Sequence, residues 1–288
     1  MFGGFFNRMY YGNPNKPDLK RGDTQIGRFK LFFTVLQVRF WKLIQLNLLY
    51  SLFWIPAFAV LYINLMAAVE SPSIIEMAGN MQSFWFAVLL FLIPFMVIAG
   101  PATAGAVYVI RNWARDEHAW LWSDFKDVWK QNWKQSLLIM LINGLVLITL
   151  YVNINFYAIQ AQQNLIYVVL HYLILMMGII YAMMNMFIFP MLVTYKLKTR
   201  QIFKNALIFT MAELPRAFVI FVLAFAIFGI VFYFSFPFII PFFIVGLTFP
   251  MLIAVSFANW VFDKYLNKES GEKEEEESLE GSEVTGDN

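Results

Sequence analysis

The chain has 288 residues, of which 60% are hydrophobic and only 14% are charged, and its formal net charge is +2. A soluble domain is typically about 45–50% apolar and about 25% charged, so this composition excludes a water-soluble globular protein. Cysteine is absent from the sequence, which excludes disulfides and thiol chemistry.

Four long runs of the sequence contain no Asp, Glu, Lys or Arg. Because a helix needs about 20 apolar residues to cross a bilayer, the two shorter runs each hold one span and the two longer runs each hold two. A β-barrel would need short alternating segments, whereas these runs are continuous. The sequence therefore predicts an all-α integral membrane protein with about six transmembrane helices, at residues 43–68, 84–110, 137–158, 165–195, 217–236 and 239–262.

All 21 Lys and Arg residues lie on one side of this six-span arrangement. The three loops on the opposite side, 69–83, 159–164 and 237–238, hold none. By the positive-inside rule the basic side is cytoplasmic, so both ends of the chain are predicted to lie in the cytoplasm. The anionic cytoplasmic face of the lipid bilayer is a sufficient partner for this charge, and no nucleic acid is needed to explain it.

Charge and periodicity divide the chain into three regions. Residues 1–24 are expected to form a cytoplasmic N-terminal segment, and residues 25–266 a six-helix membrane domain. Residues 267–288 contain nine acids and have no apolar periodicity. A segment of this composition cannot bury a core, so it is predicted to be a disordered acidic cytoplasmic tail.

Three cytoplasmic segments have the pattern of amphipathic helices that lie in the membrane interface. In residues 123–134, Phe125, Trp129 and Trp133 recur at every fourth position beside a stripe of lysines. Residues 25–42 show a similar apolar face, and residues 199–213 a weaker one. Each segment precedes two spans, so the chain reads as three units of one interfacial helix, one outgoing span and one returning span.

The three returning spans each contain a proline. The second span has Gly100 and Pro101 in the segment GPATAGAV, and the fourth and sixth have Pro190 and Pro250 in two copies of FPML. These positions are candidate hinges and predict a threefold repeat of hairpins. Proline is also common in transmembrane helices, and small residues allow close packing, so the pattern has a purely structural interpretation as well.

The spans contain amides and hydroxyls but no acid, which argues against a proton- or sodium-coupled pump. A polar cavity for a neutral saccharide is one interpretation of these groups. The alternative is hydrogen bonding between helices, because a polar group in hydrocarbon must find a partner. The candidate cavity residues are Asn47, Thr103, Asn143, Asn185 and His171.

Arg115, Asp116 and Glu117 follow the second span directly at its cytoplasmic end. Their carboxylates are candidate contacts for a partner or ligands for a metal, and a loop closed by its own salt bridges would use the same residues. The sequence contains no P-loop, HExxH, CxxC or GxSxG motif. We therefore expect no catalytic residue, no cofactor and no enzyme activity.

Several segments resemble the YesL family of bacterial polytopic membrane proteins. They are NLLY at 47–50, GPATAG at 100–105, RDE at 115–117 and the segment around NWKQ at 124–135. The resemblance extends over residues 1–262 and leaves out the acidic tail. It implies a location in the bacterial cell membrane and an association with carbohydrate ABC transporters and sensor kinases, but it supplies no molecular function and no catalytic residue.

Two functions are compatible with these observations. The first is an accessory or permease-like component of carbohydrate uptake, since neutral sugars are bound by amides and aromatic faces. The second is a non-transporting scaffold or assembly factor that docks a transporter or sensor kinase through its cytoplasmic amphipathic helices. A cavity open to one side and lined by Asn and Trp would favour the first function, and a closed interior filled with Phe would favour the second.

Overall fold

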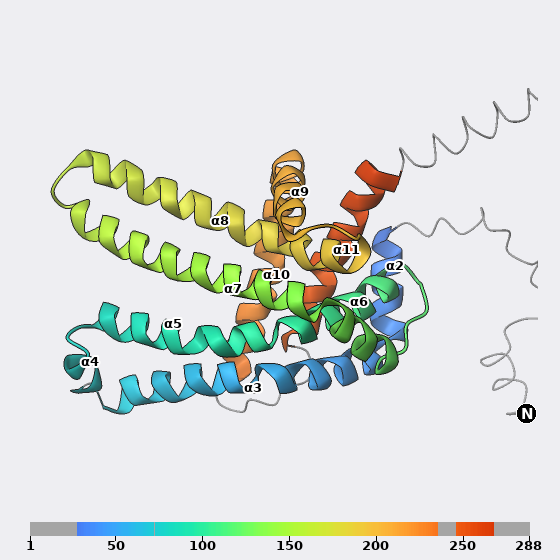
Figure 1. Ribbon diagram of the computed structural model, residues 1–288, viewed down its shortest axis with the longest axis horizontal. Helices are drawn as coiled ribbons and strands as arrows, with labels where there is room; N and C mark the ends of the chain where they lie inside the picture. The colour runs from blue at the N-terminus through green and yellow to red at the C-terminus, as the bar shows by residue number, and fades with distance from the viewer. Residues whose placement is uncertain (1–27, 72, 236–245, 268–288) are drawn as a thin grey trace, which may run out of the picture.

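The computed structural model describes residues 28–71, 73–235 and 246–267, and these residues contain helices and no strands (Figure 1). The predicted segment 1–24 and all but the first residue of the tail 267–288 lie outside the described residues. The helices are α2 (Arg28–Val38), α3 (Phe40–Glu70), α4 (Ser73–Met77), α5 (Met81–Ile98), α6 (Gly100–Ala114), α7 (Ser123–Gln160), α8 (Leu165–Thr194), α9 (Thr199–Ala212), α10 (Leu214–Ser235), α11 (Thr248–Phe262) and the short π-helix η2 (Asp263–Asn267).

Five of the described helices are long and apolar enough to cross a membrane, namely α3, α5, α7, α8 and α10. The prediction of an all-α integral membrane protein is therefore confirmed. The sixth predicted span, 239–262, begins among residues that are not described, and its described part is the 15-residue helix α11.

The second predicted span, 84–110, is divided into two helices at Ala99. Helix α5 ends at Ile98, and α6 begins at Gly100 with Pro101 in its first turn. Proline has no N–H to donate, and the first turn of a helix is where this loss costs least. Gly100 and Pro101 thus begin a helix. Whether the chain moves at this break stays a prediction.

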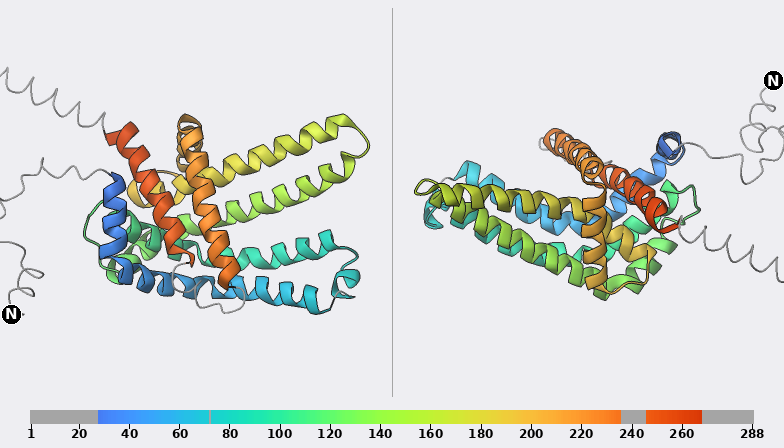
Figure 2. Two further views of the ribbon diagram at one scale, coloured as in Figure 1. Left: turned by 180° about the vertical axis from the view of Figure 1, so that it is seen from behind. Right: turned by 90° about the horizontal axis from the view of Figure 1, so that it is seen from above.

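Four long helices, α3, α5, α7 and α8, lie side by side in a row along the long axis of the molecule (Figure 1). Helices α10 and α11 cross this row steeply, α11 towards the end that carries α2 and α10 nearer the middle, as the front and back views show (Figures 1 and 2). The threefold ring of hairpins stays a prediction, because residues 236–245, which join α10 to α11, lie outside the described residues. The start of α10 and both ends of α11 are fixed by the polar contacts described in the next section.

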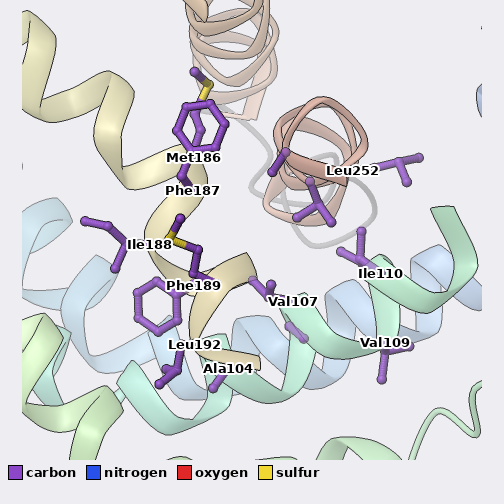
Figure 3. Close-up of a cluster of buried hydrophobic side chains, with 14 of the residues drawn as sticks. Ala104, Val107, Val109, Ile110, Met186, Phe187, Ile188, Phe189, Leu192 and Leu252 are labelled. Carbon is purple, nitrogen blue, oxygen red and sulfur yellow. The ribbon is translucent and has the colours of Figure 1, made fainter. Parts of the chain in front are cut away.

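The hydrophobic core lies where the three returning segments meet. Helices α6 and α11 and the second half of α8 pack together there (Figure 3). Phe187 and Phe262 are fully buried, with ring centroids 6.4 Å apart, and Phe257 lies 5.7 Å from Phe187. We call this end of the molecule, which carries Arg111 and Lys196, the basic end. At the opposite end the long helices expose apolar side chains, which suits contact with lipid.

Small residues bring α6 unusually close to α7. A Cβ atom on Gly105 would lie 2.7 Å from the carbonyl oxygen of Phe125, and one on Gly100 would lie 2.8 Å from that of Ser136. Both distances are too short for a real Cβ atom, so the backbones approach in the way that small residues permit in membrane helices.

Replacing Gly105 with alanine should destabilise the protein. The new methyl group would meet a backbone oxygen and the ring of Phe125, and overpacking of this kind typically costs about 1–3 kcal/mol. The melting temperature of Gly105→Ala in detergent micelles should fall by several degrees. Gly229→Ala is the matched control, because a Cβ atom at that helical glycine meets nothing within 4 Å. Equal melting temperatures for the two variants would contradict the close packing of α6 and α7.

Candidate functional site

Asn47 is fully buried in α3 and caps the start of α11. Its Oδ1 atom accepts hydrogen bonds from the backbone N–H groups of Leu247 and Thr248, both at 2.9 Å. The hydroxyl of Thr248 in turn donates to the carbonyl of Leu43 at 3.4 Å. The first N–H groups of a helix have no partner within it, and water cannot reach this position. Asn47 therefore joins two helices that are 200 residues apart in the sequence.

Thr103 joins α6 to α3. Its hydroxyl lies 2.8 Å from the hydroxyl of Tyr50 and donates to the carbonyl of Ala99 at 3.0 Å. Both side chains are buried, so this hydrogen-bonded pair lies within the contact between the two helices and does not line a cavity.

Asn143 and Asn185 form a cluster with Tyr181 between α7 and α8. Asn143 Nδ2 donates to Asn185 Oδ1 at 2.8 Å, and the hydroxyl of Tyr181 donates to Asn143 Oδ1 at 2.6 Å. Asn185 Nδ2 donates to the carbonyl of Tyr181 at 2.9 Å. Sequence reasoning missed Tyr181, although its position one turn before Asn185 places the two side chains on the same face of a helix.

His171 lies in the outer half of α8, away from the other candidates. Its ring contacts that of Tyr172 at 5.6 Å, and its Nδ1 atom is buried with no hydrogen-bond partner within the described part of the chain. Of the five candidate cavity residues, Asn143 and Asn185 are bonded to each other, and Asn47, Thr103 and His171 lie elsewhere. The structure does not bring them together around one cavity.

Arg115 and Glu117 belong to a network of ion pairs, and Asp116 forms a separate ion pair with Arg39, the residue between α2 and α3. Arg115 Nε lies 2.8 Å from a carboxylate oxygen of Glu117, and its Nη1 atom lies 2.9 Å from one of Asp263 in η2. Asp116 has a positive φ of 59° and lies 3.7 Å from Arg39. The sequence left open a partner contact, a metal site and a loop closed by its own salt bridges. This geometry fits the loop closed by salt bridges. The described residues contain no group of three His, Asp or Glu side chains that could hold a metal ion.

Glu213, between α9 and α10, is a buried acid that sequence reasoning missed. Its side chain is 2% exposed and accepts hydrogen bonds from Lys264, Arg216 and the hydroxyl of Tyr265, the last at 2.8 Å. Burial raises the pKa of this carboxyl group, but hydrogen bonds from its three partners outweigh that effect and lower the pKa to about 2. It is the only acid between residues 128 and 262, and this isolation is the signal that could have identified it.

Comparison with known protein families gives a match over part of the chain. Residues 80–154 match a family described as "Protein of unknown function, DUF624". The matched segment contains α5, α6 and most of α7, and so includes the close contact of Gly105 with Phe125 and the ion pair of Arg115 with Glu117. No curated protein and no solved structure matches the chain. The match is consistent with the resemblance to the YesL family but does not name it, so that resemblance stays a prediction.

Replacing Asn47 with leucine should destabilise the protein, since the N–H groups of Leu247 and Thr248 would lose their acceptor. A buried donor left without a partner costs about 1–3 kcal/mol, so we expect the melting temperature in detergent to fall by several degrees. Asn64→Leu is the matched control, because Asn64 lies in the same helix and donates only to the carbonyl of Val60 within it. Equal losses in both variants would show that the bond to α11 contributes nothing.

The lowered pKa of Glu213 predicts a specific pH dependence of stability. The folded-state pKa of about 2 lies below the ordinary value of 4.5, so the contribution of this carboxylate is complete above about pH 4.5 and is lost as the pH falls towards 2. Glu213→Gln should lower the melting temperature at pH 6, and the difference from wild type should shrink between pH 4.5 and 2.5. A difference that stays constant over this range would contradict the assignment.

Proposed function

We propose that this chain is a non-transporting membrane scaffold, whose basic end docks a transporter or a sensor kinase. One observation carries the proposal: the amide side chains that could line a saccharide cavity are already bonded to other helices. Asn47 is hydrogen-bonded to the first residues of α11, and Asn143 is hydrogen-bonded to Asn185. A sugar would have to replace these bonds inside hydrocarbon, where a lost partner is costly.

The packing at the basic end supports the same function. The helices meet through Phe187, Phe257 and Phe262, which fill the interior with aromatic rings. A saccharide site needs a hollow with polar groups that point into it. A closed, Phe-filled interior is what we expect of a scaffold.

A surface suited to docking lies on the loop between α6 and α7. The ion pairs of Arg115 with Glu117 and Asp263 hold this loop to η2. Beyond them, Trp120 and Trp122 are 67% and 59% exposed. Tryptophan is enriched among the residues that contribute most to binding between proteins, and a loop that is already ordered loses less entropy when it binds.

The kind of partner follows from the sequence resemblance. Proteins that it resembles are associated with carbohydrate ABC transporters and sensor kinases, so we expect an accessory role in carbohydrate uptake at the cytoplasmic face of the bacterial cell membrane. The proposal assigns no catalytic step, cofactor or metal to the chain. Transport would belong to the partner.

The proposal predicts that the two exposed tryptophans are needed for partner binding. Purification of the tagged protein from native membranes, followed by mass spectrometry, should yield a transporter subunit or a sensor kinase. The double variant Trp120→Ser with Trp122→Ser should recover at least about tenfold less of this partner, which corresponds to a loss of about 1.4 kcal/mol. Tyr172→Ser is the control, because Tyr172 is also well exposed, at 66%, but lies at the opposite end.

A second measurement separates the scaffold from a permease. Proteoliposomes that contain only this chain should take up labelled mono- and disaccharides no faster than empty liposomes. Saturable uptake by the chain alone would overturn the proposal. Full partner recovery with the tryptophan variant would instead exclude this docking surface.

A further inference from the structure

A polar pocket lies at the basic end between α7 and the segment that joins α8 to α9. Its volume is about 650 Å³. Gln131, Asn132 and Gln135 of α7 form one wall, and residues 192–199 form the other. Gln135 Nε2 donates to the carbonyl of Leu197 at 2.9 Å, which fixes the two walls to each other. Pockets that bind small ligands typically occupy about 300–1,000 Å³, so this one has a suitable size.

The pocket has the electrostatics of an anion site. Lys196 and Lys198 line it, and none of its lining residues is acidic. Lys198 is also the residue that precedes α9, a helix of 14 residues, and Thr199 at its first position is in the lining. The first N–H groups of a helix have no partner within it and carry a partial positive charge, which favours phosphate. Lys196, Lys198 and the start of α9 therefore lie around the same polar pocket.

The depth of the pocket matches the headgroup region of a bilayer. The apolar helix α8 ends at Thr194, and the pocket continues directly from that point to Thr199. Next in sequence to the α7 wall, but not lining the pocket, Trp133 is 48% exposed beside Lys134, whose Nζ atom lies 5.4 Å from the indole ring. Exposed tryptophan next to lysine is typical of the membrane–water interface. The apolar residues Leu192 and Val193, in the last turn of α8, also line the pocket.

We propose that this pocket binds the phosphate of an anionic membrane phospholipid. Lys196 and Lys198 bond the phosphate oxygens, and the amides of α7 face the polar part of the headgroup. The start of α9 adds the N–H groups of Thr199 and Arg200, because those of Lys198 and Gln201 already bond Gln201 Oε1 and the carbonyl of Lys198. Basic pockets between membrane helices on the cytoplasmic side are suited to such headgroups. Inorganic phosphate has the same oxygen chemistry but lacks the glycerol and acyl groups, and a neutral saccharide would leave both lysines without a charged partner.

The test compares three probes on the full chain in neutral detergent: phosphatidylglycerol in mixed micelles, inorganic phosphate and maltose. Phosphatidylglycerol should raise the melting temperature by about 2–4 °C, and the other two probes should not. The double variant Lys196→Gln with Lys198→Gln should bind phosphatidylglycerol about tenfold or more weakly, because charge-assisted bonds to phosphate are lost. Both lysines are exposed, so the variant should keep the melting temperature of the lipid-free protein.

A control variant with the same change in charge is Lys126→Gln with Lys130→Gln, since these lysines lie on α7 and do not line the pocket. It should keep most of the affinity for phosphatidylglycerol. Equal losses in the two variants would overturn the proposal, because attraction would then depend on the overall charge alone. Equal stabilisation by inorganic phosphate would overturn the assignment to a lipid, and stabilisation by maltose would identify a saccharide site instead.

Discussion

A polar group inside hydrocarbon has no water to bond, and the contacts of this protein follow from that constraint. Asn47 is bonded to the start of α11, Thr103 to Tyr50, and Asn143 to Asn185. Each bond joins two different helices, so each amide or hydroxyl fixes a helix–helix contact. Since lipid is as apolar as leucine, such bonds and close backbone packing are what hold membrane helices together.

The same contacts explain why α10 and α11 cross the other helices. Asn47 holds the first residues of α11 against α3, and Glu213 at the start of α10 is bonded to Lys264 and Tyr265 in η2. Helices α10 and α11 are therefore held by polar contacts, while α11 packs in the core and α10 exposes apolar side chains such as Phe225. The result is an ordered basic end with a closed interior, which presents Trp120 and Trp122 on one surface and a lysine-lined pocket on another.

Hydropathy and charge were enough to predict the class of the fold. The length of an apolar run and the loops that contain lysine can both be read directly from the local sequence. They did not predict the partners of Asn47, since a contact across 200 residues depends on how the helices assemble. The division of the second span at Ala99 was only hinted at by Pro101. Glu213 could have been found as an isolated acid, but its partners in η2 could not, because no local pattern links them.

Asn47, Thr103, Asn143 and Asn185 are bonded across helix contacts, so a reagent dissolved in water should not reach these contacts. The chain contains no cysteine, so single cysteines can be introduced and labelled without background. Ser51, which is 1% exposed beside Asn47, and Met184, which is 8% exposed beside Asn185, report on the two polar contacts. In membrane vesicles, Ser51→Cys and Met184→Cys should not react with a membrane-impermeant thiol reagent from either side, whereas the exposed His118→Cys should react from one side. Fast labelling of the buried positions, slowed by a saccharide, would contradict the account.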